Sequence, residues 1–150
     1  MDALQTRFLR DRGISEKEAL MSFGLAPLCV RRDIAMLGLI HRSVLGKGPN
    51  HFSTFFVRAA KSTLRTRLQR SRHSKQLIDT RDTLHLEVAR RSALGLVSVY
   101  NLLPQECVDA HCVSEFQGFL QRMVKHRVSR ADWLDTLSPR IPMHCHPLCS

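Results

Sequence analysis

The longest helical pattern in the chain spans residues 28–45 and reads LCVRRDIAMLGLIHRSVL. Apolar side chains follow one another at the three- and four-residue spacing of an α-helix along one stripe, and others fill the neighbouring side. A helix that is apolar over most of its circumference is typically buried, so this segment is expected to form the centre of the core. Gly46, Gly48 and Pro49 mark its end. His41 lies close to the stripe, where a single histidine is usually a hydrogen-bonded core residue.

A second amphipathic helix is predicted from Glu115 to Lys125. Ser114 followed by Gln117 has the spacing of a capping box, in which two side chains satisfy free N–H groups of the first helical turn. Apolar residues recur along one face at helical spacing, so this face is expected to pack on the segment 28–45. The expected contacts join Phe116, Phe119 and Leu120 with Ile34 and Leu37.

Shorter patterns predict further helices at residues 3–9, 15–23, 90–103 and 131–137. Ser15 and Glu18 form a capping box at the start of the second of these helices. Gly95 weakens the third helix, because glycine is a poor helix former, and Pro104 ends it. Alternation of apolar and polar residues over 84–88 predicts one short strand.

These patterns predict a mainly α fold, a small and irregular helical domain with one short strand or hairpin and flexible termini. The length of 150 residues is that of one ordinary domain, and a hydrophobic content of 43% is enough for a modest core. We divide the chain into a helical lead-in at 1–26, a helical domain at 27–137 and a tail at 138–150. The tail is rich in Pro, His and Cys and is expected to be disordered.

The charge of the chain points to a polyanionic partner. There are 23 Lys and Arg residues against 13 Asp and Glu residues, which gives a formal net charge of +10. Such a charge concentrates phosphate-bearing molecules near the surface without specifying a sequence. RNA or DNA, bound through phosphate contacts, is therefore the expected partner.

The cations are densest between Val57 and Lys75, where the sequence contains no acidic residue. Val57, Leu64 and Leu68 recur at helical spacing, which would place several of the cations on an adjoining face. If the segment is instead a disordered arm, the same charges bind but at an ordering cost. The predicted nucleic-acid-binding residues are Arg58, Lys61, Arg65, Arg67, Arg70, Arg72 and Lys75.

Cysteine and histidine residues supply ligand types that suit zinc, but not at the usual spacings. One group is Cys107, His111 and Cys112, and the other, in the tail, is His144, Cys145, His146 and Cys149. Because neither matches a paired-ligand pattern, no metal site and no cofactor is predicted. The five cysteines are odd in number and unevenly placed, which argues against a secreted disulfide framework and for an intracellular chain, nuclear or cytoplasmic.

No pattern in the chain predicts catalysis. Cys107 near His111 is a weak nucleophile and base pair, and the glycine-rich, zinc-protease and serine-hydrolase motifs are absent. The acidic residues are scattered, whereas a polymerase needs clustered carboxylates for two metal ions. The longest clean apolar stretch, residues 35–40, is too short for a transmembrane segment.

Two blocks of the sequence carry a resemblance to a known family. The first, residues 27–56, reads PLCVRRDIAMLGLIHRSVLGKGPNHFSTFF, with a paired arginine, a leucine-rich centre, a His-Arg step, then Gly, Pro and aromatic residues. The second, residues 90–120, contains Asn101, Leu103, Pro104, Val108, Ser114, Phe116 and Leu120 in the family's order. Together they resemble the region downstream of the polymerase core in LINE-like, non-LTR retrotransposon reverse transcriptases. Tyr100 stands where the family usually has Trp, and Gln117 where it usually has Lys.

The resemblance implies a nucleic-acid-associated accessory domain rather than an enzyme. The polymerase aspartates and the endonuclease residues of the family belong to blocks that do not occur in this sequence, and the tail does not match the family's Cys/His knuckle. Two other interpretations remain open. One is a basic amphipathic fragment that binds an acidic protein or an anionic membrane surface, and the other is a remnant of a decayed element with no selected activity.

Overall fold

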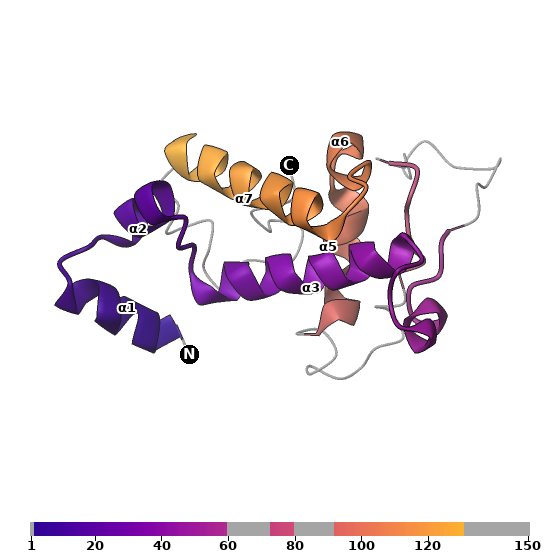
Figure 1. Cartoon of the computed structure of the whole chain (residues 1–150), viewed down its shortest axis with the longest axis horizontal. Coiled ribbons are helices and arrows are strands. Elements are labelled where there is room, and N and C mark those ends of the chain that lie inside the picture. The colour runs from indigo at the N-terminus through magenta and orange to yellow at the C-terminus, as the bar shows by residue number, and fades with distance from the viewer. Residues whose placement is uncertain (1, 60–72, 80–91, 131–150) are drawn as a thin grey trace.

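The computed structural model of the chain describes residues 2–59, 73–79 and 92–130 (Figure 1). The predicted strand at 84–88, the predicted helix at 131–137 and the tail at 138–150 lie outside these ranges. Within the described ranges the fold is mainly α, as the sequence predicts. The β pairing in these ranges is an isolated antiparallel bridge between Arg58 and Leu77.

The helical elements pack around one long central helix. In chain order they are α1 (Asp2–Asp11), α2 (Glu16–Phe23), α3 (Leu28–Val44), the 3-10 helices η1 (Asn50–Thr54) and η3 (Ala93–Leu96), α5 (Val97–Leu102), α6 (Gln105–Val108) and α7 (Val113–Arg130). Figure 1 shows α7 along one side of α3, with α2 beside the end of α7 and with α5 and α6 beside its beginning.

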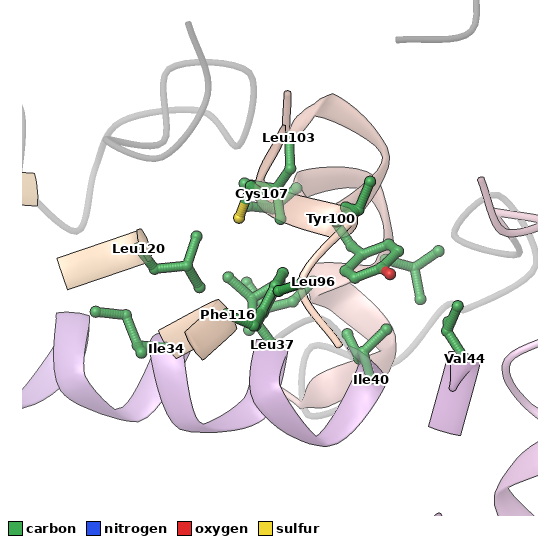
Figure 2. Close-up of a cluster of buried hydrophobic side chains, with 14 of the residues drawn as sticks. Ile34, Leu37, Ile40, Val44, Leu96, Tyr100, Leu103, Cys107, Phe116 and Leu120 are labelled. Atoms are coloured by element: carbon green, nitrogen blue, oxygen red, sulfur yellow. The ribbon is translucent and has the colours of Figure 1, made fainter. Parts of the chain in front are cut away.

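Helix α3 is the centre of the core, and its bounds agree within one residue with the predicted segment 28–45. Figure 2 shows its side chains Ile34, Leu37 and Ile40 pointing into a cluster of apolar residues from α5 and α7. The helix ends before Gly46, whose φ of +72° is a conformation that glycine adopts without steric cost. The prediction of a buried central helix is confirmed.

Helices α3 and α7 run antiparallel and approach closely. Near the end of α3 the ring of His41 stacks on that of Phe116, with centroids 4.1 Å apart, and near its start Arg31 lines the same groove as Lys125. Between them, a Cβ atom on Gly38 would lie 2.5 Å from Nε2 of the Gln117 side chain. Gly38 therefore leaves room for the Gln117 side chain between the two helices.

Helix α7 begins at Val113, two residues earlier than its capping pattern predicts. Cys112 occupies the cap position, where its Sγ accepts a hydrogen bond from the backbone N–H of Glu115 at 3.4 Å. The Glu115 carboxylate reaches back and accepts the N–H of His111 at 3.1 Å. The predicted box of Ser114 and Gln117 is wrong, because the Gln117 side chain packs against α3 instead.

The predicted packing of α7 on α3 is right for two of its three residues. Phe116 and Leu120 are fully buried in the cluster that contains Ile34 and Leu37. Phe119 is only partly buried at the edge of this cluster. The Arg122 guanidinium lies over the Phe119 ring, 5.0 Å from the ring centroid. The helical spacing is right, but Phe119 lies at the margin of the buried stripe rather than at its centre.

The helix predicted for 90–103 is divided in the described part. Ala93–Leu96 forms the tighter turn η3 around Gly95, and the α-helix α5 begins only at Val97. Pro104 ends α5, as predicted, and it then starts the short helix α6, which the sequence pattern does not reveal.

The first two helices join the body through a few buried side chains. Ser15 Oγ accepts the N–H of Glu18 at 3.1 Å, which confirms the predicted cap of α2, and Gly24 closes the helix with a φ of +66°. Leu9 of α1 and Leu20 of α2 are each 2% exposed.

Candidate nucleic-acid interface

The predicted binding segment enters and leaves the body of the protein at one place. Of its seven cations, the structure describes the first and the last, Arg58 and Lys75. The other five, Lys61, Arg65, Arg67, Arg70 and Arg72, fall in residues 60–72 and lie outside the described residues.

Two short runs of backbone form the base of this segment. The N–H of Ala59 donates to the carbonyl of Gln76 at 2.8 Å, and the N–H of Ile78 donates to the carbonyl of Val57 at 2.9 Å. These bonds flank the antiparallel bridge that pairs Arg58 with Leu77. The two ends of the basic segment are thus held side by side.

Asn101 of α5 binds this base to the helical body with both atoms of its amide. Its Oδ1 accepts the N–H of Leu77 at 2.8 Å, and its Nδ2 donates to the carbonyl of the same residue at 2.9 Å. The Gln76 side chain donates to the backbone carbonyl of Asn101 at 3.2 Å. The Asn101 amide therefore makes the two backbone hydrogen bonds with Leu77 that a neighbouring strand would otherwise make. Sequence reasoning singled out Asn101 only through the family resemblance.

His73 anchors the returning end of the segment. It is 5% exposed, and its Nε2 lies 2.9 Å from the carbonyl oxygen of Tyr100. Beside it, the Gln105 side chain accepts the N–H of Ser74 at 2.8 Å. Sequence reasoning missed this histidine, because a histidine within a run of cations suggests charge rather than burial.

Arg58 and Lys75 each donate to the carbonyl of the last residue of a helix. Arg58 Nη2 binds the carbonyl of Val44 in α3 at 2.7 Å, and Lys75 Nζ binds the carbonyl of Val108 in α6 at 2.5 Å. Such carbonyls have no partner inside their own helix, so cations are favourable there. The two terminal cations of the predicted set therefore help to fix the base.

Buried polar side chains of the core form hydrogen bonds beside the same region. His41 is fully buried, with Nε2 at 3.0 Å from the carbonyl oxygen of Ala110 and Nδ1 at 3.1 Å from the Tyr100 hydroxyl. Because a carbonyl only accepts, Nε2 carries the proton and the hydroxyl donates to Nδ1. Both ring nitrogens are satisfied, which confirms the sequence prediction of a hydrogen-bonded core histidine.

His73 has the same neutral tautomer as His41. Its Nε2–H donates to Tyr100, and its Nδ1 accepts the backbone N–H of Lys75 at 3.1 Å. Burial lowers the pKa of both histidines below the usual 6.5, and the ammonium of Lys75 lowers both further, against the opposing effect of the carbonyl that each one binds. Burial also raises the pKa of the Tyr100 hydroxyl. The chain His41–Tyr100–His73 is therefore uncharged at neutral pH.

The cysteines of the described ranges are in different surroundings. Cys107 is fully buried, and burial raises the pKa of its thiol to about 12, so the thiol stays protonated at neutral pH and is a poor nucleophile. Cys29 is half-buried and packs against the core, and Cys112 is exposed at the start of α7. In the part of the chain that the structure describes, no three His, Cys, Asp or Glu residues are grouped as metal ligands.

Comparisons of the chain with protein-family models, with curated proteins and with solved structures find no match. Among the described residues, no helix combines the length and the apolar character needed to cross a membrane.

Proposed function

We propose that this chain is a non-catalytic, nucleic-acid-associated domain that contacts phosphates through the basic segment from Arg58 to Lys75. The observation that carries the proposal is that an acid-free segment with seven cations starts and ends at one hydrogen-bonded base on a folded helical body. A base of this kind presents the cations from a fixed point, which supplies orientation as well as attraction.

The base explains why the contact is local. Hydrogen bonds of Asn101 and His73 fix the base on α5, and the bridge between Arg58 and Leu77 pairs the two runs of the base with each other. The resemblance of the chain to the tail of retrotransposon reverse transcriptases supports the same class of partner. No base-reading motif occurs in the sequence, so the binding that we propose does not depend on nucleotide sequence.

The test is a salt titration of binding to a labelled RNA and a labelled DNA duplex. Several phosphate contacts predict that log K falls steeply with log salt between about 50 and about 200 mM, at roughly 0.9 per contact for DNA. Replacing Arg65, Arg67, Arg70 and Arg72 by Gln should weaken binding and flatten the slope by several units, about one for each phosphate that is no longer neutralised.

The matched control removes the same number of charges elsewhere. Arg7, Arg10, Arg12 and Lys17 are exposed on and beside α1 and α2, and their replacement by Gln lowers the net charge equally. This control should keep most of the salt slope. A flat salt response of the native chain would contradict the proposal, as would a control that weakens binding more than the variant of the basic segment does.

Vesicles separate the proposal from membrane binding. Sedimentation with anionic and neutral vesicles should show weaker binding than to RNA of matched charge. Stronger binding to the anionic vesicles would favour a membrane surface over nucleic acid.

A further inference from the structure

Helices α2, α3 and α7 line a groove to which none of the residues that form the base contributes. Its volume is about 180 Å³. An engineered apolar cavity of about 150 Å³ takes up a benzene molecule, so this groove has room for one ring. The residues that line it are Leu20, Gly24, Ala26, Arg31, Ile34, Ala35, Gln117, Gln121, Val124 and Lys125.

The lining has an apolar part and a polar part. Leu20, Ile34 and Val124 are core residues, at most 4% exposed, so they close the groove toward the core and leave little surface of their own, whereas Ala35 is exposed and supplies apolar surface. The polar part consists of two cations, Arg31 and Lys125, and two amides, Gln117 and Gln121. None of the described residues that line the groove is acidic.

Most of these polar groups are available to a ligand. Lys125 Nζ makes one long contact, 3.5 Å, with the carbonyl of Met21. Within the described ranges, the side chains of Arg31, Gln117 and Gln121 have no hydrogen-bond or ion-pair partner. Arg32, the neighbour of Arg31, instead pairs with Asp33 at 3.6 Å.

The chemistry of this lining matches the two halves of a nucleotide. The faces of a base are apolar, and its edge carries hydrogen-bond donors and acceptors of the kind that a Gln amide recognises. Its phosphate is an anion that suits a guanidinium and an ammonium. A purely apolar side chain of a protein partner would cover the two amides without pairing them, which is unfavourable.

We infer that the α2–α3–α7 groove binds one unpaired nucleotide, with the base against Ala35 and the two glutamine amides and the phosphate between Arg31 and Lys125. The inference rests on the proposed function and goes beyond it, because it predicts a preference for single strands. A base inside a duplex is stacked and paired, whereas a base in a single strand is free to enter a pocket.

The experiment compares two strands that differ only in their bases. One is a short oligothymidylate, and the other is an oligomer of equal length in which abasic sites replace all the bases. The native chain should bind the oligothymidylate about tenfold more tightly, which corresponds to one or two hydrogen bonds and a buried ring.

Two pairs of variants locate the effect. Ala35→Leu narrows the groove without changing its charge, so it should abolish the preference for the oligothymidylate and leave binding to the abasic strand unchanged. The control, Ala3→Leu, adds the same side chain to the exposed surface of α1 and should preserve the preference. Arg31→Gln should reduce binding to the oligothymidylate more than Arg32→Gln does, although each removes one positive charge from adjacent positions of α3. Thermal melting of each variant shows that it is folded.

The results separate this inference from the function on which it rests. Equal affinity for both strands, or a preference that survives Ala35→Leu, would overturn the groove assignment and leave binding by the basic segment intact. No binding to duplex, oligothymidylate or abasic strand would overturn both. A third outcome would assign the groove to a protein partner instead. In that case Ala35→Leu would abolish binding of an acidic, leucine-containing peptide and leave binding of the oligothymidylate unaffected.

Discussion

His41 and His73 both bind Tyr100, the first through its hydroxyl and the second through its carbonyl. Each histidine is neutral, and each has both ring nitrogens in hydrogen bonds. A proton added to either one would place a positive charge among buried groups and near the ammonium of Lys75. The residues that tie the basic segment to the core are therefore sensitive to acid.

This arrangement predicts how stability depends on pH. The folded pKa of both histidines lies below 6.5, so in acid the unfolded chain takes up protons that the folded chain does not. Their contribution to stability is complete above pH 6.5 and falls as the pH drops below it, by up to about 1.4 kcal/mol per pH unit for each histidine.

Urea unfolding at several values between about pH 7.5 and about pH 5 measures this dependence. The variants His41→Gln and His73→Gln should each show a shallower dependence. His126→Gln changes an exposed histidine of α7 and serves as the control. If the single variants keep the full slope, the protons are taken up elsewhere.

Phe116 and Phe119 lie three residues apart on α7 but should differ in their contribution to stability. Phe116 is fully buried and stacks on His41, so Phe116→Ala should cost about 3 to 5 kcal/mol. Phe119 is partly exposed, and Phe119→Ala should cost about 1 kcal/mol. Chemical denaturation of both variants makes the comparison, and equal destabilisation would show that Phe119 is a core residue in solution.

At the scale of the elements, Asn101 has an unusual role, since one side chain completes the backbone pairing of Leu77. Asn101→Ala removes a donor and an acceptor at once and leaves the Leu77 N–H and C=O without partners. The expected decrease in stability is about 1 to 3 kcal/mol. Hydrogen exchange should speed up at the amides of Leu77 and Ile78 much more than at those of α3.

Asn101→Asp refines this prediction, because it keeps the acceptor for the Leu77 N–H and removes the donor to the Leu77 carbonyl. Its effect on exchange at the base should lie between those of the native chain and of Asn101→Ala. Uniform acceleration over the whole chain would instead mean that Asn101 supports the entire core.

The predictability of the elements depends on where their signals lie in the sequence. The bounds of α3 follow from its apolar stripe and from Gly46, all of which are local. The start of α7 does not follow from local signals, because cysteine is an uncommon helix cap. The cap at Cys112 also depends on Glu115 and on the contact of Gln117 with α3. The sequence predicts a weakness at Gly95, but it does not say that a 3-10 turn takes the place of the first helical turns.

At the scale of the whole molecule, the mainly α fold and the α3–α7 core follow from periodicity, whereas the two candidate binding features do not. The basic run is visible in the sequence, but the base that holds it joins Val57, Leu77 and Asn101, which are far apart along the chain. The groove is likewise lined by residues of three helices that are far apart along the chain. Periodicity within one segment carries no information on such tertiary neighbours.

The antiparallel arrangement of α3 and α7 also affects the electric field of the protein. These two helices, of 17 and 18 residues, are the longest in the described ranges. Aligned peptide dipoles give each helix about half a positive charge at its beginning and half a negative charge at its end. Because the helices run in opposite directions, these partial charges largely cancel at a distance. An approaching polyanion is therefore steered by the side-chain charges, whose sum is +10, and its rate of association should fall as the ionic strength rises.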